Sequence, residues 1–324
     1  TNVSGAQAAT YNYDPLGNRT TASGTGTPSS YTPNNLNQYS SVDGTTYTYD
    51  LNGNLTNDET KTYNYDFENR LISVIPAQAG IQSTYQYDPF GRRLSSSLRG
   101  VPPWRDDEAI SYLYDGDQII EAFPCNLSSS TCTLSQSFLS GPAIDEPLEL
   151  LQHPSGATYY YHQDGLSSVV SITDSSGVVR ESYTYDPYGI PSNASTIGSP
   201  YLFTGREYDA EAKLYFYRAR HYESKLGRFL QRDPVGYYDD LNIYLYARNN
   251  PLYARDPFGL FFWSEEDVRS EWEKTETGRR INSELPESTD FKRYHKWPWD
   301  GANAKYSGTT DTIYIPWYYT SRQA

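Results

Sequence analysis

Two copies of one short phrase carry the side chains best suited to chemistry. Asp233-Pro-Val-Gly236 returns 23 residues later as Asp256-Pro-Phe-Gly259. Two carboxylates that are brought together cannot both stay ionised, so such a pair holds a single proton. It can then deprotonate a water and donate to a carbonyl. The same phrase also suits a type I turn, with Asp at the first position, Pro at the second and Gly at the fourth.

The context of each copy separates a plain turn from a candidate site. The Asp-Pro-x-Gly phrase begins at five positions: Asp14, Asp88, Asp186, Asp233 and Asp256. The first three lie in ordinary repeats, so a turn is the default interpretation of any one copy. The last copy is followed at once by Leu260, after which the Tyr-Asp character of the chain ends.

The Asp-Pro-x-Gly phrases must be positioned by the strands around them, and most of these strands come from a repeat built on Tyr-x-Tyr-Asp. Its clearest copies are "YNYDPLGNRT" (11–20), "YTYDLNGNLT" (47–56), "YNYDFENRLI" (63–72), "YQYDPFGRRL" (85–94) and "YTYDPYGIPS" (183–192). The alternation puts both Tyr rings on one face of a strand, and the Asp begins a turn. Each copy therefore predicts a hairpin. Because one hairpin cannot bury its own face, the copies should stack into a long sheet.

The composition fits such a sheet. The chain has 324 residues, of which 33 are Tyr, and a hydrophobic fraction of only 37%. Much of the buried surface must therefore come from Tyr rings. A formal net charge of -14 argues against nucleic acid or an anionic membrane surface as a partner of the shell. No stretch is apolar enough to predict a membrane span, and a start at Thr1 without any Met suggests a piece of a longer protein.

The two cysteines leave an alternative open. Cys125 and Cys132 lie in "CNLSSSTC", where they could form a disulfide or remain free thiols. Two thiols without Cys or His companions make a poor metal site. We expect no metal and no cofactor.

The Tyr-Asp copies resemble the YD repeats of the RHS family, bacterial rearrangement-hotspot proteins related to insecticidal toxin-complex subunits and to teneurins. Residues 201–260 resemble the RHS-associated core module, which precedes a variable C-terminal cargo. The resemblance implies a mainly β fold in which hairpins stack into a spiralling sheet, a hollow cocoon, followed by a small α+β tail. The implied domains are YD repeats over 1–200, the core module over 201–260, and an effector region, or its truncated start, over 261–324.

The resemblance also implies a reaction. Similar RHS proteins cut themselves after the Leu of Asp-Pro-x-Gly-Leu, with core-module carboxylates acting as in an aspartyl protease. By position, Asp233 and Asp256 are the catalytic pair, and Leu260-Phe261 is the cleaved bond. The family's usual "RYYDP" reads "RHYES" here, so Glu223 stands where an Asp is expected. It keeps the carboxylate one methylene further out, and it is the third catalytic candidate.

Other polar residues of this part of the chain have simpler interpretations. Four arginines could polarise a carbonyl, but ion pairs within the module are expected: Arg218, Arg220, Arg228 and Arg232. Three histidines stand singly beside Tyr-rich strands and are interpreted as packing or surface residues: His153, His162 and His221.

The tail changes in character. Ser264 suits a helix N-cap, and Val268 and Trp272 are spaced for one helical face. Further on, "DTIYIPWYY" predicts a strand. The tail has one histidine, His295, and no catalytic motif, so an effector activity is not indicated.

These observations predict the shell of a bacterial polymorphic toxin, secreted or held at the cell surface, which cleaves itself to release an effector for competition between bacteria or attack on a host. Its partners would be its own C-terminal toxin as cargo, a cognate immunity protein and a secretion apparatus. The alternative is a surface adhesin or glycan-binding wall protein, because exposed Tyr rings also stack on carbohydrate; it would leave the Leu260-Phe261 bond intact. A third hypothesis makes the tail the enzyme and the shell its packaging.

Overall fold

The computed structural model describes residues 9–23, 27–77, 82–99, 108–126, 131–238, 240–261 and 263–264. The chain divides into two compact units, Thr1–Ser264 and Glu265–Ala324. The second unit lies outside the described residues, and with it the helix and the strand predicted for the tail.

Short strands make up nearly all of the regular structure in the described residues. They are β1 (Thr10–Tyr13), β2 (Arg19–Ser23), β3 (Tyr31–Pro33), β4 (Tyr39–Val42), β5 (Thr45–Thr46), β6 (Thr48–Tyr49), β7 (Leu55–Asn57), β8 (Lys61–Tyr65), β9 (Leu71–Pro76), β10 (Gln82–Tyr87), β11 (Arg93–Arg99), β12 (Glu108–Asp115), β13 (Gln118–Asn126), β14 (Thr131–Cys132), β15 (Gln136–Ser140), β16 (Pro147–Gln152), β17 (Thr158–Gln163), β18 (Val169–Asp174), β19 (Val179–Ser182), β20 (Glu207–Asp209), β21 (Leu214–Tyr217), β22 (Arg220–Glu223), β23 (Arg228–Phe229), β24 (Ala254–Arg255) and β25 (Trp263–Ser264). Two 3₁₀ turns, η1 (Phe203–Gly205) and η2 (Ala247–Asn249), complete the set.

Four of the five clearest Tyr-Asp copies fold as the predicted strand hairpins, whereas the copy at 183–192 forms only an isolated bridge between Tyr185 and Pro191. In the copy that joins β10 to β11, the N–H of Gly91 donates to the Asp88 carbonyl at 3.0 Å, which closes the turn. The Asp88 carboxylate accepts the N–H groups of Phe90 and Arg92 at 2.8 and 2.9 Å. The Asp thus satisfies the hydrogen bonds of the turn from within, and the turn needs no distant partner.

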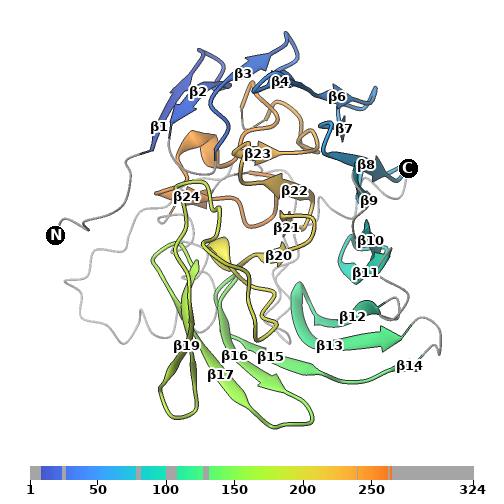
Figure 1. Cartoon of the computed structure of the whole chain (residues 1–324), viewed down its shortest axis with the longest axis vertical. Helices are drawn as coiled ribbons and strands as arrows, with labels where there is room; N and C mark the ends of the chain where they lie inside the picture. The colour runs from blue at the N-terminus through green and yellow to red at the C-terminus, as the bar shows by residue number, and fades with distance from the viewer. Residues whose placement is uncertain are drawn as a thin grey trace, which may run out of the picture. The chain divides into compact units, whose positions relative to one another are not determined.

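The hairpins stack into one long antiparallel sheet, as predicted. Its order is β19-β18-β17-β16-β15-β13-β12-β11-β10-β9-β8-β7-β6, with β14 paired to β13. The smaller sheets β1-β2 and β3-β4-β5 precede it and are joined by a bridge between Thr21 and Ser30. These strands form an arc around the core module (Figure 1).

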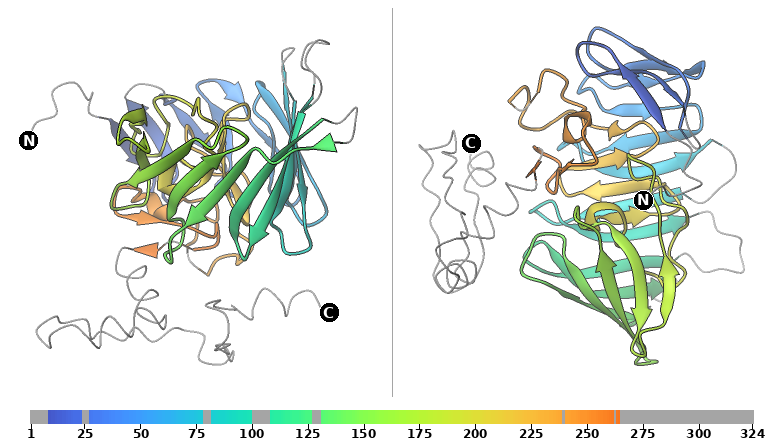
Figure 2. Two further views of the ribbon diagram at one scale, coloured as in Figure 1. Left: turned by 90° about the horizontal axis from the view of Figure 1, so that it is seen from below. Right: turned by 90° about the vertical axis from the view of Figure 1, so that its left-hand side faces the viewer.

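The core module fills the concave side of this arc. Its sheet, β20-β21-β22-β23, lies in the middle of the curved sheet in both further views (Figure 2). Tyr222 packs on Tyr246 with ring centroids 4.4 Å apart, and its hydroxyl donates to the Tyr188 carbonyl at 2.8 Å. The same cluster includes aliphatic residues of the large sheet, among them Leu150 and Ile172. Tyr rings therefore build much of the core, as the composition predicted, and hydroxyls such as that of Tyr222 have a partner.

Cys125 and Cys132 form a disulfide that links β13 to β14. This decides between the two states that the sequence left open. The bond ties a two-residue strand to the edge of a longer one, so its effect is local.

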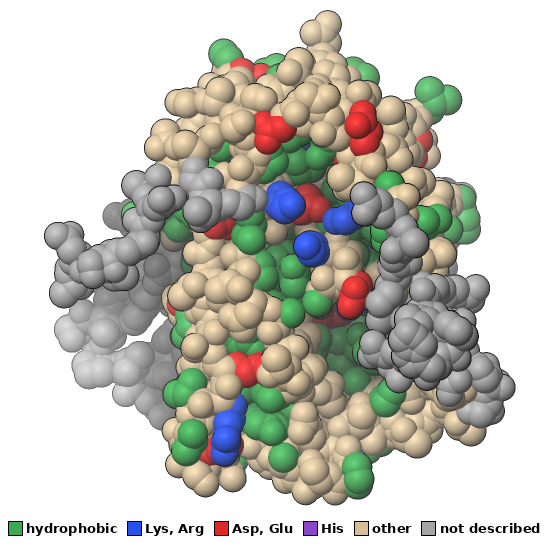
Figure 3. Space-filling model, viewed as in Figure 1, with side chains coloured by type: hydrophobic (Ala, Val, Ile, Leu, Met, Phe, Trp, Pro, Cys, Tyr) green, Lys and Arg blue, Asp and Glu red, His purple; other side chains and the backbone are tan. Residues whose placement is uncertain are grey.

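Figure 3 shows hydrophobic side chains gathered over the middle of one face, beside a group of Lys and Arg side chains. Among the described helices, none is long and apolar enough to cross a membrane. Within the same residues, no group of three or more His, Cys, Asp or Glu side chains is arranged to hold a metal ion.

Candidate active site

One buried arginine brings the two predicted acids together. Arg220 begins β22, and its Nη2 atom lies 2.9 Å from Oδ2 of Asp233 and 3.1 Å from Oδ2 of Asp256. The three side chains are 2%, 7% and 2% exposed. The interpretation of Arg220 as an ion-pair residue is confirmed, but its position between the two acids was missed. The sequence contains no signal for it, because the three residues meet only through tertiary packing.

The rest of the guanidinium is equally fixed. Nε of Arg220 donates to the Gly259 carbonyl at 2.6 Å, and Nη1 donates to the Ile243 carbonyl at 3.1 Å. The guanidinium carbon lies 3.7 Å from the centre of the Phe229 ring. Arg220 therefore holds the turn that precedes Leu260 while it also pairs with both acids. A planar fork of donors can make these contacts simultaneously.

Asp256 contacts the predicted cleavage bond directly. Its Oδ1 atom accepts the N–H of Leu260 at 3.0 Å and the N–H of Phe261 at 3.2 Å. The second of these nitrogens belongs to the Leu260-Phe261 peptide bond. In an ordinary repeat such as that of Asp88, the carboxylate binds the amides two and four residues later. The carboxylate of Asp256 instead accepts from the amides four and five residues later.

Both phrases are nevertheless turns. The N–H of Gly236 donates to the Asp233 carbonyl at 3.0 Å, and the N–H of Gly259 donates to the Asp256 carbonyl at 3.3 Å. They differ from the repeats because the carboxylates of Asp233 and Asp256 share one partner, the guanidinium of Arg220. The turn and the candidate site thus use the same residues.

The carboxyl group of Asp256, which contacts the candidate bond, can hold a proton near neutral pH. Burial raises the pKa of Asp256 from 3.8 to about 7, and the charge of Asp233 adds to this rise. Arg220 and the N–H of Leu260 oppose the rise because they favour the carboxylate. The pair can therefore carry a single proton, which is the state that acid and base catalysis by two carboxylates requires.

The turn that carries the bond is pressed against the core-module sheet. Gly259 has φ +65°, and a Cβ atom at this position would lie 2.5 Å from the Tyr217 carbonyl oxygen. Only glycine combines this conformation with so close an approach. The position of Leu260 is therefore set by backbone contact with the end of β21.

Glu223 lies apart from the pair. It ends β22, and because strand residues alternate between faces, an odd separation places it on the face opposite Arg220. Its carboxylate is 3.7 Å from Nζ of Lys61. Burial raises the pKa of Glu223, whereas Lys61 lowers it. The structure does not bring Glu223 to Asp233 and Asp256, and its role in the reaction stays a prediction.

The remaining three arginines each have a different environment. Arg218 forms the expected ion pair, with Asp145 at 2.8 Å. Arg228 instead lies over the Tyr39 ring at 3.5 Å and donates to the Asn37 carbonyl at 2.7 Å. Arg232 is exposed.

The histidines fit the structural roles expected of them. His221 is buried between Tyr85 and Phe216, and burial holds its pKa well below its usual value. His153 and His162 have hydroxyl partners at 3.0 Å in neighbouring strands.

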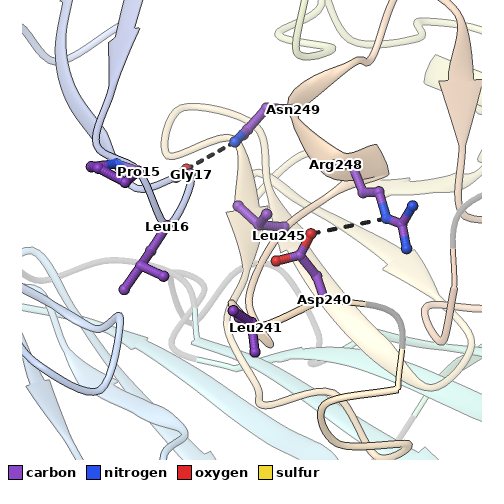
Figure 4. Close-up of a pocket in the computed structure, with 8 residues that line it drawn as sticks. All are labelled: Pro15, Leu16, Gly17, Asp240, Leu241, Leu245, Arg248 and Asn249. Atoms are coloured by element: carbon purple, nitrogen blue, oxygen red, sulfur yellow. Dashed lines mark hydrogen bonds and ion pairs between the residues drawn. The ribbon is translucent and has the colours of Figure 1, made fainter.

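A pocket at the surface lies elsewhere. It is formed by the first Asp-Pro-x-Gly turn and the loop before η2, and it is lined by Pro15, Leu16, Gly17, Asp240, Leu241, Leu245, Arg248 and Asn249 (Figure 4). Asn249 donates to the Gly17 carbonyl at 2.8 Å across it. The two acids do not line this pocket.

The fold is that expected of an RHS-type shell, and comparisons with known proteins agree on the fold. A family model described as teneurin YD-shell matches residues 1–256, so the chain belongs to the YD-shell family. It is 32% identical over 266 residues to the tRNA3(Ser)-specific nuclease WapA of Bacillus spizizenii, covering 78% of this chain and 11% of that protein. It is 25% identical over 249 residues to the double-stranded DNA deaminase toxin A of Burkholderia cenocepacia, covering 66% of this chain and 17% of that protein.

Solved structures support the same fold. The holotoxin pore of the Photorhabdus luminescens Tc toxin matches with a TM-score of 0.59 and 23% identity, over 78% of this chain and 13% of that chain. The predicted mainly β shell is therefore confirmed. The chain spans less than a fifth of each of these three proteins.

Proposed function

We propose that this chain is the end of an RHS-type toxin shell that cleaves its own Leu260-Phe261 bond. The observation that supports this most strongly is the contact of Asp256 with the N–H of Phe261, together with Asp233, which pairs with the same nitrogen of Arg220 as Asp256 does. A peptide bond, a buried acid of raised pKa and a second carboxylate thus share one site. Their common fold makes the attack intramolecular, and a single turnover is all that release requires.

The proposed reaction is hydrolysis. Asp233 takes a proton from a water, whose oxygen adds to the Leu260 carbonyl carbon. The C–N bond then breaks while protonated Asp256, which contacts the nitrogen of Phe261, donates its proton to that nitrogen. The tetrahedral carbon becomes a carboxyl group, and the proton that Asp233 gained returns to Asp256. One water is consumed, a carboxyl group forms at Leu260 and an amine forms at Phe261.

Cleavage would separate the shell from residues 261–324 and from whatever follows them. Two relatives are named as a nuclease and as a deaminase toxin, which supports a toxic effector as cargo. Because the module fills the sheet described above, the space for cargo would be provided by the rest of the parent shell. An immunity protein and a secretion apparatus would complete the system. The disulfide supports export, since such bonds persist in oxidising compartments.

The test is the intact mass of the freshly refolded protein. The unaltered chain should yield two fragments, 1–260 and 261–324. Asp233→Asn and Asp256→Asn should remain whole. The matched control is Asp88→Asn, which changes the same turn phrase next to an arginine, Arg92, far from the bond in sequence.

Each outcome has a defined meaning. If the Asp88→Asn control is cut and the Asp233→Asn and Asp256→Asn variants stay uncut, the result supports the paired-acid reaction. If the unaltered chain stays whole although it is folded, self-cleavage is wrong, and the adhesin hypothesis gains. If Asp256→Asn is still cut after Leu260, the paired-acid reaction is wrong.

A further inference from the structure

The turn that carries the candidate bond is held by Arg218 of the core module, and Arg218 is in turn paired with a residue outside that module. Arg218 follows β21, and its Nη1 atom donates to the Pro257 carbonyl. The guanidinium also lies 5.2 Å from the centre of the Phe258 ring. These two residues directly follow Asp256, so the orientation of Arg218 bears on where Asp256 and Leu260 lie.

Arg218 is itself oriented by Asp145. Its Nη2 atom lies 2.8 Å from Oδ1 of Asp145, a side chain that is 1% exposed. Asp145 belongs to the connection between β15 and β16, within the YD repeats. The same Oδ1 also pairs with Nη1 of Arg206 at 2.6 Å. Burial would raise the pKa of Asp145, but the two guanidinium groups hold it below its usual value, so the anion persists.

A second contact ties the same connection to the other side of Asp256. Arg255 donates to the carbonyls of Ile144 and Leu166, each at 3.4 Å. Ile144 adjoins Asp145 in the chain. The residues that flank Asp256 in sequence, Arg255 and Pro257, are thus both tied to the hairpins β15–β18.

We propose that Asp145 is a positioning residue for self-cleavage. It orients Arg218, and through Arg218 it fixes the turn that carries Asp256 and the Leu260-Phe261 bond. The inference rests on the proposed function. It implies that the chain is cut only after the hairpins β15–β18 have packed on the core module, so cleavage follows closure of this part of the shell.

The test compares Asp145→Asn, Arg218→Gln and the double variant in the full chain. Each variant is refolded from denaturant, and the loss of uncut chain is followed by intact mass. The cleavage rate is then divided by the folded fraction, which is measured by near-ultraviolet circular dichroism. A displaced reactive group can slow a reaction by about 100-fold, so each single variant should cut about 10- to 100-fold more slowly. The double variant should be no slower than the slower single variant, because Asp145 acts through Arg218. The pH at which the rate halves should not move, since Asp233 and Asp256 are unchanged.

The control is Arg70→Gln, which removes an ion pair within the repeats, 2.6 Å from Asp66. It should cut at the unaltered rate per folded molecule. The inference is wrong if Asp145→Asn is cut at a rate within about threefold of that of the unaltered chain. It is also wrong if the rate reductions of the two single variants multiply in the double variant. If Asp145→Asn fails to fold, the more exposed Arg218→Gln decides alone, and an unaltered rate overturns the inference.

The same experiment separates the two proposals. If the unaltered chain is cut, Asp256→Asn is not, and Asp145→Asn cuts at full rate, only the positioning role is wrong. If Asp256→Asn is cut, the proposed function itself is wrong.

Discussion

Self-cleavage should slow as the pH rises above neutrality, because Asp256 must hold the proton of the pair. Burial raises the pKa of this carboxyl to about 7. A group with that pKa is about 90% protonated at pH 6, about 10% at pH 8 and about 1% at pH 9. The rate at pH 9 is therefore expected to be about a hundredth of the rate at pH 6.

The assay starts from uncut chain purified in denaturant and refolded at fixed pH between 6 and 9. Samples are stopped by returning them to denaturant, and uncut and cut chains are counted by intact mass. Glu223→Gln is the matched control. It removes a buried carboxyl on the other face of β22, so it should leave the pH midpoint of the rate unchanged.

The folded fraction must be measured at each pH, because the same carboxyl affects stability. Its folded pKa is raised above 3.8, so the native state binds the proton more tightly than the unfolded chain does. This contribution is complete below pH 3.8 and is lost as the pH rises through about 7. A rise from 3.8 to about 7 corresponds to about 4 kcal/mol.

A rate per folded molecule that is constant or increases between pH 6 and 9 would refute the assignment of the proton to Asp256. A midpoint that moves in Glu223→Gln would instead place Glu223 in the catalytic group, as the sequence-based hypothesis has it.

Three further outcomes follow from the geometry. Gly259→Ala should slow cleavage at least about 100-fold, because the added Cβ would meet the Tyr217 carbonyl. Gly236→Ala is the control and should be cut almost normally, because the space around Gly236 is open. Intact mass distinguishes the two outcomes. Arg220→Lys should leave the chain uncut in the same assay, because one ammonium cannot replace contacts to two acids and two carbonyls. Tyr217→Phe should lower the free energy of unfolding by about 1–3 kcal/mol in urea titrations, because it removes a hydroxyl bonded to two buried hydroxyls.

The sequence by itself determined the hairpins and their stacking. An Asp such as Asp88 binds amides only two and four residues away, so the turn is formed from adjacent residues and can be read from them. The period-two Tyr pattern then sets which side chains face inward. The resemblance to RHS proteins likewise rested on contiguous phrases, and it supplied the pairing of Asp233 with Asp256 as an expectation.

Only the tertiary structure decided how the site is arranged. Arg220, Asp233 and Asp256 occupy separate turns and strands, and their side chains meet because the module packs inside the curved sheet. The same packing places Asp145, from a distant hairpin, against Arg218. Such contacts depend on how whole strands are stacked, and no local pattern of residues encodes them. Local turns need only neighbours in the chain, whereas a buried pair of acids needs the complete fold to hold it.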